Sequence, residues 1–140
     1  ADPMRRPHAR FNGARLEEAA EPWNHKQNDA IGYFLWLRCR LGVEGKMPNT
    51  EDHLRLLAQI MEYLRKIEYW RDEDSGHWEE AEKVQASSIG AVLAGVREFK
   101  RLERKCMALG FFCEAGTVKL LETKGAEALR EILPSECRQG

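Results

Sequence analysis

The sequence predicts an all-α protein. Apolar residues recur at helical spacing in four segments, helix-capping residues precede these segments, and no segment shows convincing strand alternation. A chain of 140 residues fits one domain with a modest core. Residues 1–22, rich in Arg, Pro and Ala, are expected to be extended or partly disordered. Residues 23–140 are expected to form a single helical domain.

The first two helices follow from an apolar run and an amphipathic segment. The run from 30 to 41 predicts a helix that Asn28 and Asp29 can cap and that Gly42 ends. Asn49 or Thr50 can cap the second helix, which leads into the loop from Trp70 to Glu80. The apolar face of this second helix consists of Leu54, Leu57, Ile60 or Met61, Leu64 and Ile67.

The third helix begins near Ser87 or Ser88, either of which can cap it, and stops at Gly110. Gly90 and Gly95 inside it each cost about 1 kcal/mol of helix propensity relative to alanine. Close approach of a neighbouring helix would explain both glycines. The predicted core face consists of Ile89, Val92, Leu93, Val96, Phe99 and Leu102.

The fourth helical pattern covers residues 117–133. Gly125 predicts a break within it, because glycine disfavours the helix interior. Pro134 predicts its end, because the residue before a proline avoids helical backbone angles.

Composition excludes several classes of protein. The chain has 22 basic and 23 acidic side chains, so no overall field favours nucleic acid or an anionic membrane. The apolar run from 30 to 37 is too short to cross a bilayer, which takes about 20 residues. No signal peptide is visible, and residues 1–3 before Met4 are expected to be a vector remnant. We therefore expect a cytoplasmic protein.

The four cysteines show neither a CxxC motif nor paired Cys/His spacing. This pattern predicts no metal site, and we expect no cofactor. Their even number permits two disulfides, but a helical chain does not need them, so free thiols are favoured. Cys39 lies in an apolar stripe and is expected to be buried.

The segment Trp78-Glu79-Glu80 combines an indole with two adjacent carboxylates. An indole can stack on a sugar ring, and a partly buried carboxylic acid can protonate a glycosidic oxygen. Repulsion from an ionised neighbour raises the pKa of such an acid. The same residues are also typical of a helix N-terminus that carries a buried Trp, since acids there complement the helix dipole.

Three motifs together resemble glycoside hydrolase family 15. They are Trp23 with Gln27 and Asp29 before the first helix, then Trp-Glu-Glu, then Ser-Ser-Ile-Gly from 87 to 90. The resemblance covers residues 10–137 and implies a middle segment of an (α/α)6 toroid. It thereby implies a partial toroid-like array of antiparallel helix pairs with about four or five helices.

The resemblance also implies roles for individual residues. Glu79 matches the general acid, and no general base of the inverting reaction is visible in this chain. The implied substrate-binding residues are Trp23, Lys26, Gln27, Asp29, Trp78 and Glu80. By contrast, Trp36 and Trp70 lie in apolar helical patterns, which favour the core.

Two functional classes follow, with a third left open. The first is hydrolysis of α-linked glucan by a longer parent protein. The second, which the chain length favours, is a non-catalytic helical module that binds a maltooligosaccharide or a protein partner. The third is a helical interaction protein without sugar-binding residues. The wide apolar faces at 30–41 and 89–102 predict a homo-oligomer or cover by the remainder of a toroid.

Overall fold

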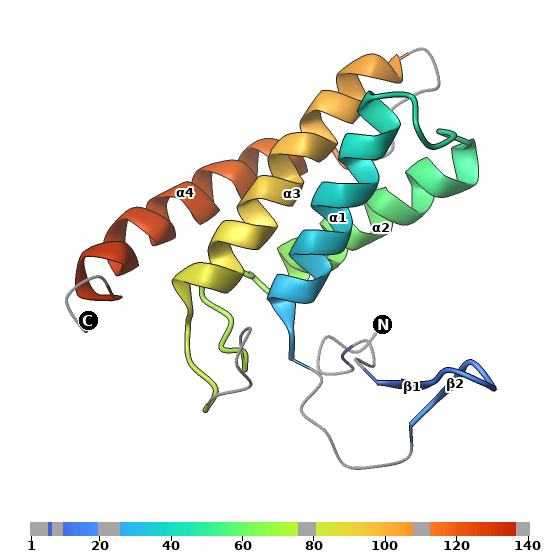
Figure 1. Ribbon diagram of the computed structural model, residues 1–140. Coiled ribbons are helices and arrows are strands. Elements are labelled where there is room, and N and C mark those ends of the chain that lie inside the picture. The colour runs from blue at the N-terminus through green and yellow to red at the C-terminus, as the bar shows by residue number, and fades with distance from the viewer. Residues whose placement is uncertain (1–5, 7–9, 20–25, 76–80, 108–112, 137–140) are drawn as a thin grey trace.

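The computed structural model describes residues 6, 10–19, 26–75, 81–107 and 113–136. These residues form four helices, which confirms the all-α prediction, and one small antiparallel hairpin (Figure 1). The helices are α1 (Asn28–Val43), α2 (Glu51–Lys66), α3 (Ala86–Lys105) and α4 (Thr117–Glu136). The strands are β1 (Phe11–Asn12) and β2 (Glu17–Glu18).

Helices α1 and α3 pack side by side and run in the same direction (Figure 1). Gly32 near the start of α1 lies against Ala91 and Val92 of α3. At the other end, Lys105 Nζ donates to the carbonyl oxygen of Val43 at 2.6 Å. Helix α4 runs back along α3 in the opposite direction, so this pair has the antiparallel arrangement that we expected (Figure 1).

The core lies where the apolar faces of all four helices meet. Every residue predicted for the core face of α3 is buried, and so are Leu54, Leu57, Met61 and Leu64 of α2. The close helix approach predicted at Gly95 is confirmed, because a Cβ there would lie 2.9 Å from the Gly32 carbonyl oxygen. At Gly90 the prediction is wrong, since a Cβ would meet no atom within 4 Å.

Two of the three predicted helix caps are wrong. Thr50 caps α2 as predicted, with its Oγ1 accepting from His53 N at 3.3 Å. Helices α1 and α3 instead begin after Gln27 and Gln85, neither of which makes a side-chain cap bond. The predicted capping side chains bind elsewhere: Asn28 Nδ2 donates to Asp72, and Ser88 Oγ donates to Asp74.

Helix α4 has neither the predicted break nor the predicted end. It continues through Gly125, which lies against the ring of Tyr69, and it includes Pro134 in its last turn. The Tyr69 hydroxyl donates to the carbonyl oxygen of Leu121 at 2.9 Å. Gly125 therefore leaves room for the Tyr69 ring against α4, which explains a glycine in a helix interior that otherwise disfavours it.

The hairpin lies within the segment that we expected to be extended or partly disordered. Asn12 Oδ1 accepts hydrogen bonds from the backbone N–H groups of Ala14 and Arg15, and Leu16 adopts a positive φ of 56°. Asn12-Gly13 is a hairpin signal that the sequence analysis did not use. Both strands are exposed along their length.

Candidate protein-interaction site

The residues assigned to sugar binding divide into two groups. Trp23, Trp78, Glu79 and Glu80 lie outside the described residues. Lys26, Gln27 and Asp29 lie at the start of α1, where the Lys26 carbonyl oxygen accepts from Ser75 N at 3.0 Å. Lys26 Nζ also pairs with Glu82 Oε2 at 2.5 Å. Residues 26–29, which belong to the motif before the first helix, therefore meet residues 70–75 of the loop that leads to Trp-Glu-Glu. They meet at the N-terminal end of α1.

Asp74 connects these segments through hydrogen bonds, and its side chain is fully buried. One carboxylate oxygen, Oδ2, accepts from Asn28 N at 3.0 Å, and the other, Oδ1, accepts from Ser88 Oγ at 3.0 Å. Its backbone pairs with that of Lys83 in an isolated antiparallel bridge. One aspartate thus ties the 70–75 loop to the first turns of α1 and α3.

The electrostatics of this cluster are those of a structural site. Burial raises the pKa of the Asp74 carboxyl, and the charges of Asp29 and Asp72 raise it further. The hydrogen bonds from Ser88 and Asn28 act in the opposite direction. Both carboxylate oxygens are engaged by bonds within the protein, so Asp74 is not placed to act on a substrate.

We expect the raised pKa of Asp74 to make its stability contribution depend on pH. The folded state binds the proton more tightly than the unfolded state, so the contribution is greatest below the unfolded pKa of about 3.9. It is lost as the pH rises through the folded pKa. The stability of wild type relative to Asp74→Asn should therefore fall as the pH rises above the unfolded pKa of about 3.9. Urea unfolding of both proteins at several pH values measures this difference; a difference that stays constant or rises contradicts it.

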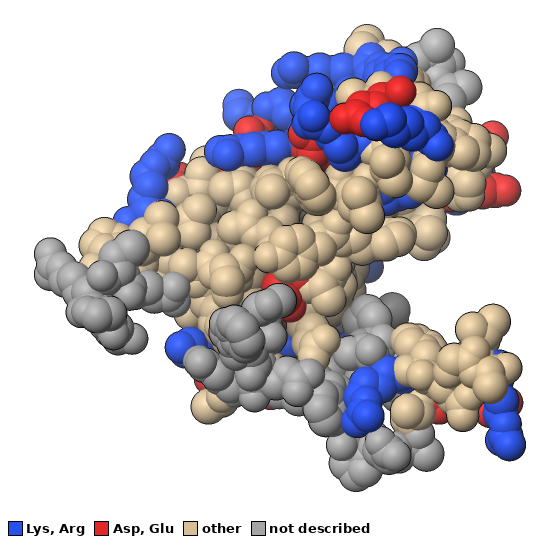
Figure 2. Space-filling model, viewed as in Figure 1, with Lys and Arg blue, Asp and Glu red and all other residues tan. Residues whose placement is uncertain are grey.

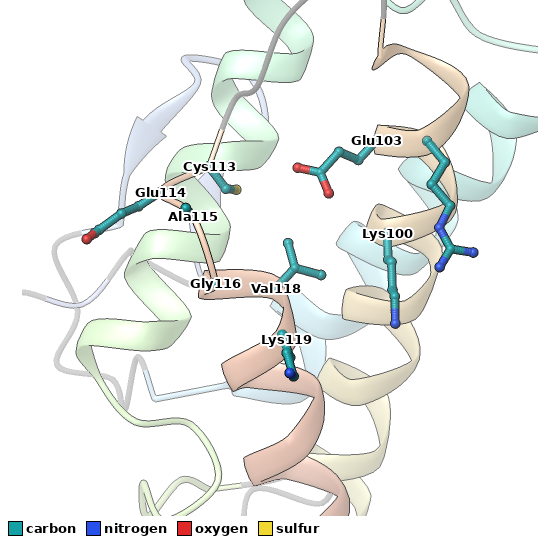
Figure 3. Close-up of a pocket in the computed structure, with 9 residues that line it drawn as sticks. Lys100, Glu103, Cys113, Glu114, Ala115, Gly116, Val118 and Lys119 are labelled. Atoms are coloured by element: carbon teal, nitrogen blue, oxygen red, sulfur yellow. The ribbon is translucent and has the colours of Figure 1, made fainter.

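A pocket of about 580 Å³ lies between the C-terminal half of α3 and the start of α4 (Figure 3). Glu103 points its carboxyl group across this pocket toward Cys113, whereas Glu114 points away (Figure 3). The remaining lining residues are Lys100, Arg104, Ala115, Gly116, Val118 and Lys119.

The thiol in this pocket is not activated. Burial raises the pKa of Cys113 to about 12, with the charges of Glu103 and Glu62 acting in the same direction. The thiol therefore stays protonated at neutral pH and is a poor nucleophile. Cys39, Cys106 and Cys113 are free, as predicted. Within the described ranges, no group of His, Cys, Asp and Glu side chains is arranged to hold a metal ion.

The exposed side of α1 carries a run of large apolar side chains. Four large apolar side chains lie on it with exposed fractions of 54% for Tyr33, 48% for Phe34, 40% for Trp36 and 51% for Leu37. The prediction that Trp36 belongs to the core is thus wrong. Trp70 is half-buried and packs edge-on against Tyr69 with ring centroids 5.7 Å apart. We call the side chains of Tyr33, Phe34, Trp36 and Leu37 the α1 face.

The surface around the α1 face is uncharged in its middle and basic at one edge. Figure 2 shows Lys and Arg side chains gathered along the edge formed by the C-terminal parts of α1 and α3. Arg40 belongs to this edge and pairs with Glu44 at 2.6 Å. A helix that is apolar on all sides normally packs against partners on all sides. Among the described residues, α3 provides the largest contact with α1, on the side that carries Gly32 and Leu35.

The fold and this surface define a small all-α protein whose helix α1 carries an exposed apolar side. No family model and no solved structure matches the chain. One curated protein is similar: the uncharacterized lipoprotein YgeQ of Escherichia coli (strain K12), 36% identical over 80 residues. The match covers 49% of this chain, and the chain spans only 30% of the length of that relative.

These comparisons overturn the resemblance to glycoside hydrolase family 15. No family model supports it, and the curated relative is a lipoprotein without a described activity. A glycoside hydrolase or carbohydrate-binding character therefore has no support. The three short motifs that suggested the family consist of residue types that are also common at helix starts.

Among the described residues, no helix has both the length and the apolar character that crossing a bilayer requires.

Proposed function

We propose that this chain is a non-catalytic helical module that binds a helix of a partner protein through the α1 face. The observation that supports this function is the row of exposed Tyr33, Phe34, Trp36 and Leu37 on one helix. Contiguous apolar patches of this kind mark interaction sites in proteins that are otherwise well packed. Aromatic side chains are also the residues that interfaces favour most.

The spacing of the apolar residues supports a helix as the bound element. Ala30, the adjacent pair Tyr33 and Phe34, Leu37 and Leu41 recur along α1 so that each step between them spans three or four residues. Such a row provides the ridge that the apolar face of a second helix packs against. The helix has 16 residues and is therefore about 24 Å long, enough for three to four turns of contact.

The chemistry of the described residues supports a non-catalytic role. The buried carboxylate of Asp74 is fully engaged within the protein, and the Cys113 thiol is protonated. The protein-binding alternative of the sequence analysis needs neither group. Catalysis by Glu79 and a cytoplasmic location both stay predictions.

Leu37→Glu is expected to weaken helix binding at least about tenfold, because it places a charge at the centre of an apolar contact. The probe is a fluorescein-labelled amphipathic peptide with leucine at its a and d positions and alternating Glu and Lys elsewhere. Fluorescence anisotropy at low protein concentration measures its affinity. Leu56→Glu on α2 is the matched control, since Leu56 has an exposed fraction of 49% against 51% for Leu37. Equal affinity of all three proteins, or no binding, contradicts the proposal.

A further inference from the structure

Helices α1 and α3, both described in full, carry many more cations than acids. In α2 and α4 the two signs are nearly balanced. Of the three acids in α1 and α3, Asp29 and Glu98 are buried and Glu103 is half-buried, so every exposed charge on these two helices is positive. The exposed cations are Arg40, Arg97, Arg101, Arg104 and Lys105.

Three of these cations lie beside the α1 face, along its C-terminal half (Figure 2). Arg40 follows Leu37 by three residues, so it lies on the same side of α1. Its Nη1 lies 3.6 Å from Glu98 Oε1, and Arg101 Nη1 of α3 pairs with the same oxygen at 2.8 Å. Lys105 reaches the end of α1 through its hydrogen bond to Val43. We call Arg40, Arg101 and Lys105 the basic flank.

The acids in contact with the basic flank do not neutralise it. Glu98 is shared between the two arginines, and its side chain has an exposed fraction of only 11%. Glu44 pairs with Arg40 but also with Lys46, at 2.8 Å. With Lys46 included, cations still outnumber acids here. Exposed ion pairs of this kind contribute little stability, so these cations can pair with a partner at small cost.

We propose that the partner of the α1 face is an acidic amphipathic helix. Its apolar row packs on the α1 face, and carboxylates beside that row pair with the basic flank. This inference rests on the proposed function and names the chemistry of the partner. Packed helices lie about 8–10 Å apart, which brings the side positions of the partner within reach of long Arg and Lys side chains. A basic helix would instead place like charges together, which disfavours it.

Two labelled peptides test the sign of the partner's charge on the wild-type chain. Both have leucine at the a and d positions. One has Glu at every e and g position and the other has Lys, so either orientation presents the same charge to the flank. Fluorescence anisotropy at low salt is expected to show the Glu peptide binding at least about tenfold more tightly. The difference should shrink in about 1 M salt, where the Debye length is about 3 Å.

A pair of double variants locates the preference. Arg101→Gln combined with Lys105→Gln is expected to remove most of it, because two of the three flank cations are lost. The matched control combines Lys119→Gln with Lys124→Gln, which removes the same charge from α4. Arg101 and Lys124 have similar side-chain exposure, 50% and 46%, and each pairs with a glutamate three residues away. The control is expected to keep the preference.

Three results would overturn the acidic partner. They are equal or tighter binding of the Lys peptide, an equal loss of preference in both double variants, and tighter binding of a labelled oligothymidylate than of the Glu peptide. If both peptides bind alike and Leu37→Glu weakens both, the helix-binding function stands and only the charge of the partner is wrong. If neither peptide binds, both proposals fail.

Discussion

Gly32→Ala is expected to lower the free energy of unfolding by about 3 kcal/mol or more. A Cβ at this position would lie 2.5 Å from Val92 N and 2.6 Å from the carbonyl carbon of Ala91. Both are backbone atoms of α3, so no side-chain rotation relieves the contact. The helices α1 and α3 must move apart along a contact that organises the core. Urea unfolding followed by circular dichroism measures the loss.

Gly90→Ala is the matched control for this prediction. Gly90 also lies in a helix, but a Cβ there would meet no atom within 4 Å. This substitution is expected to stabilise the protein by up to about 1 kcal/mol, because alanine has the higher helix propensity. Similar effects of the two substitutions, in either direction, would show that α1 and α3 do not approach as closely as described.

Gly125→Ala is expected to lower the free energy of unfolding about as much as Gly32→Ala does. Its Cβ would lie 1.8 Å from the Tyr69 hydroxyl oxygen and 2.8 Å from the ring carbon Cζ. Tyr69 is buried and donates to the Leu121 carbonyl oxygen, so its ring cannot turn into solvent without losing that bond. We expect a loss of about 3 kcal/mol or more, again from urea unfolding.

A double-mutant cycle identifies the cause of this loss. Tyr69→Phe alone is expected to cost about 1 kcal/mol, the value of one hydrogen bond. In the Gly125→Ala background it removes the atom of closest approach, so the combined loss should be smaller than the sum of the two single losses. Additive losses would mean that Gly125 and Tyr69 are not in contact.

The sequence predicts the helices well where one apolar face alone defines them. The spacing of apolar residues in α2 and α3 identified both helices and most of their buried side chains. The sequence-based predictions fail where tertiary contacts determine the local structure. Ser88 was expected to cap a helix, but its hydroxyl donates to Asp74, which is distant in sequence. Gly125 was expected to break α4, but the helix continues through it, and the Tyr69 ring occupies the space that a side chain there would fill.

The candidate site was only partly visible in the sequence. The width of the apolar arc at 30–41 predicted an uncovered surface, but not which side of the helix α3 covers. That side depends on Gly32 and Gly95, whose missing side chains let the two helices approach. The position of Trp36 could not be predicted either, because apolar residues surround α1 on every side and give no preferred face.

The most direct test of the helix-binding role is to locate where a bound helix lies. Benzoylphenylalanine replaces Leu37 in one variant and Leu56 in another. Each variant is irradiated with the amphipathic peptide that carries leucine at its a and d positions. Because both positions are about equally exposed, with fractions of 51% and 49%, accessibility alone predicts equal crosslinking. Helix binding at the α1 face predicts peptide adducts at position 37 and almost none at position 56. Equal yields at both positions, or adducts mainly at 56, would contradict it.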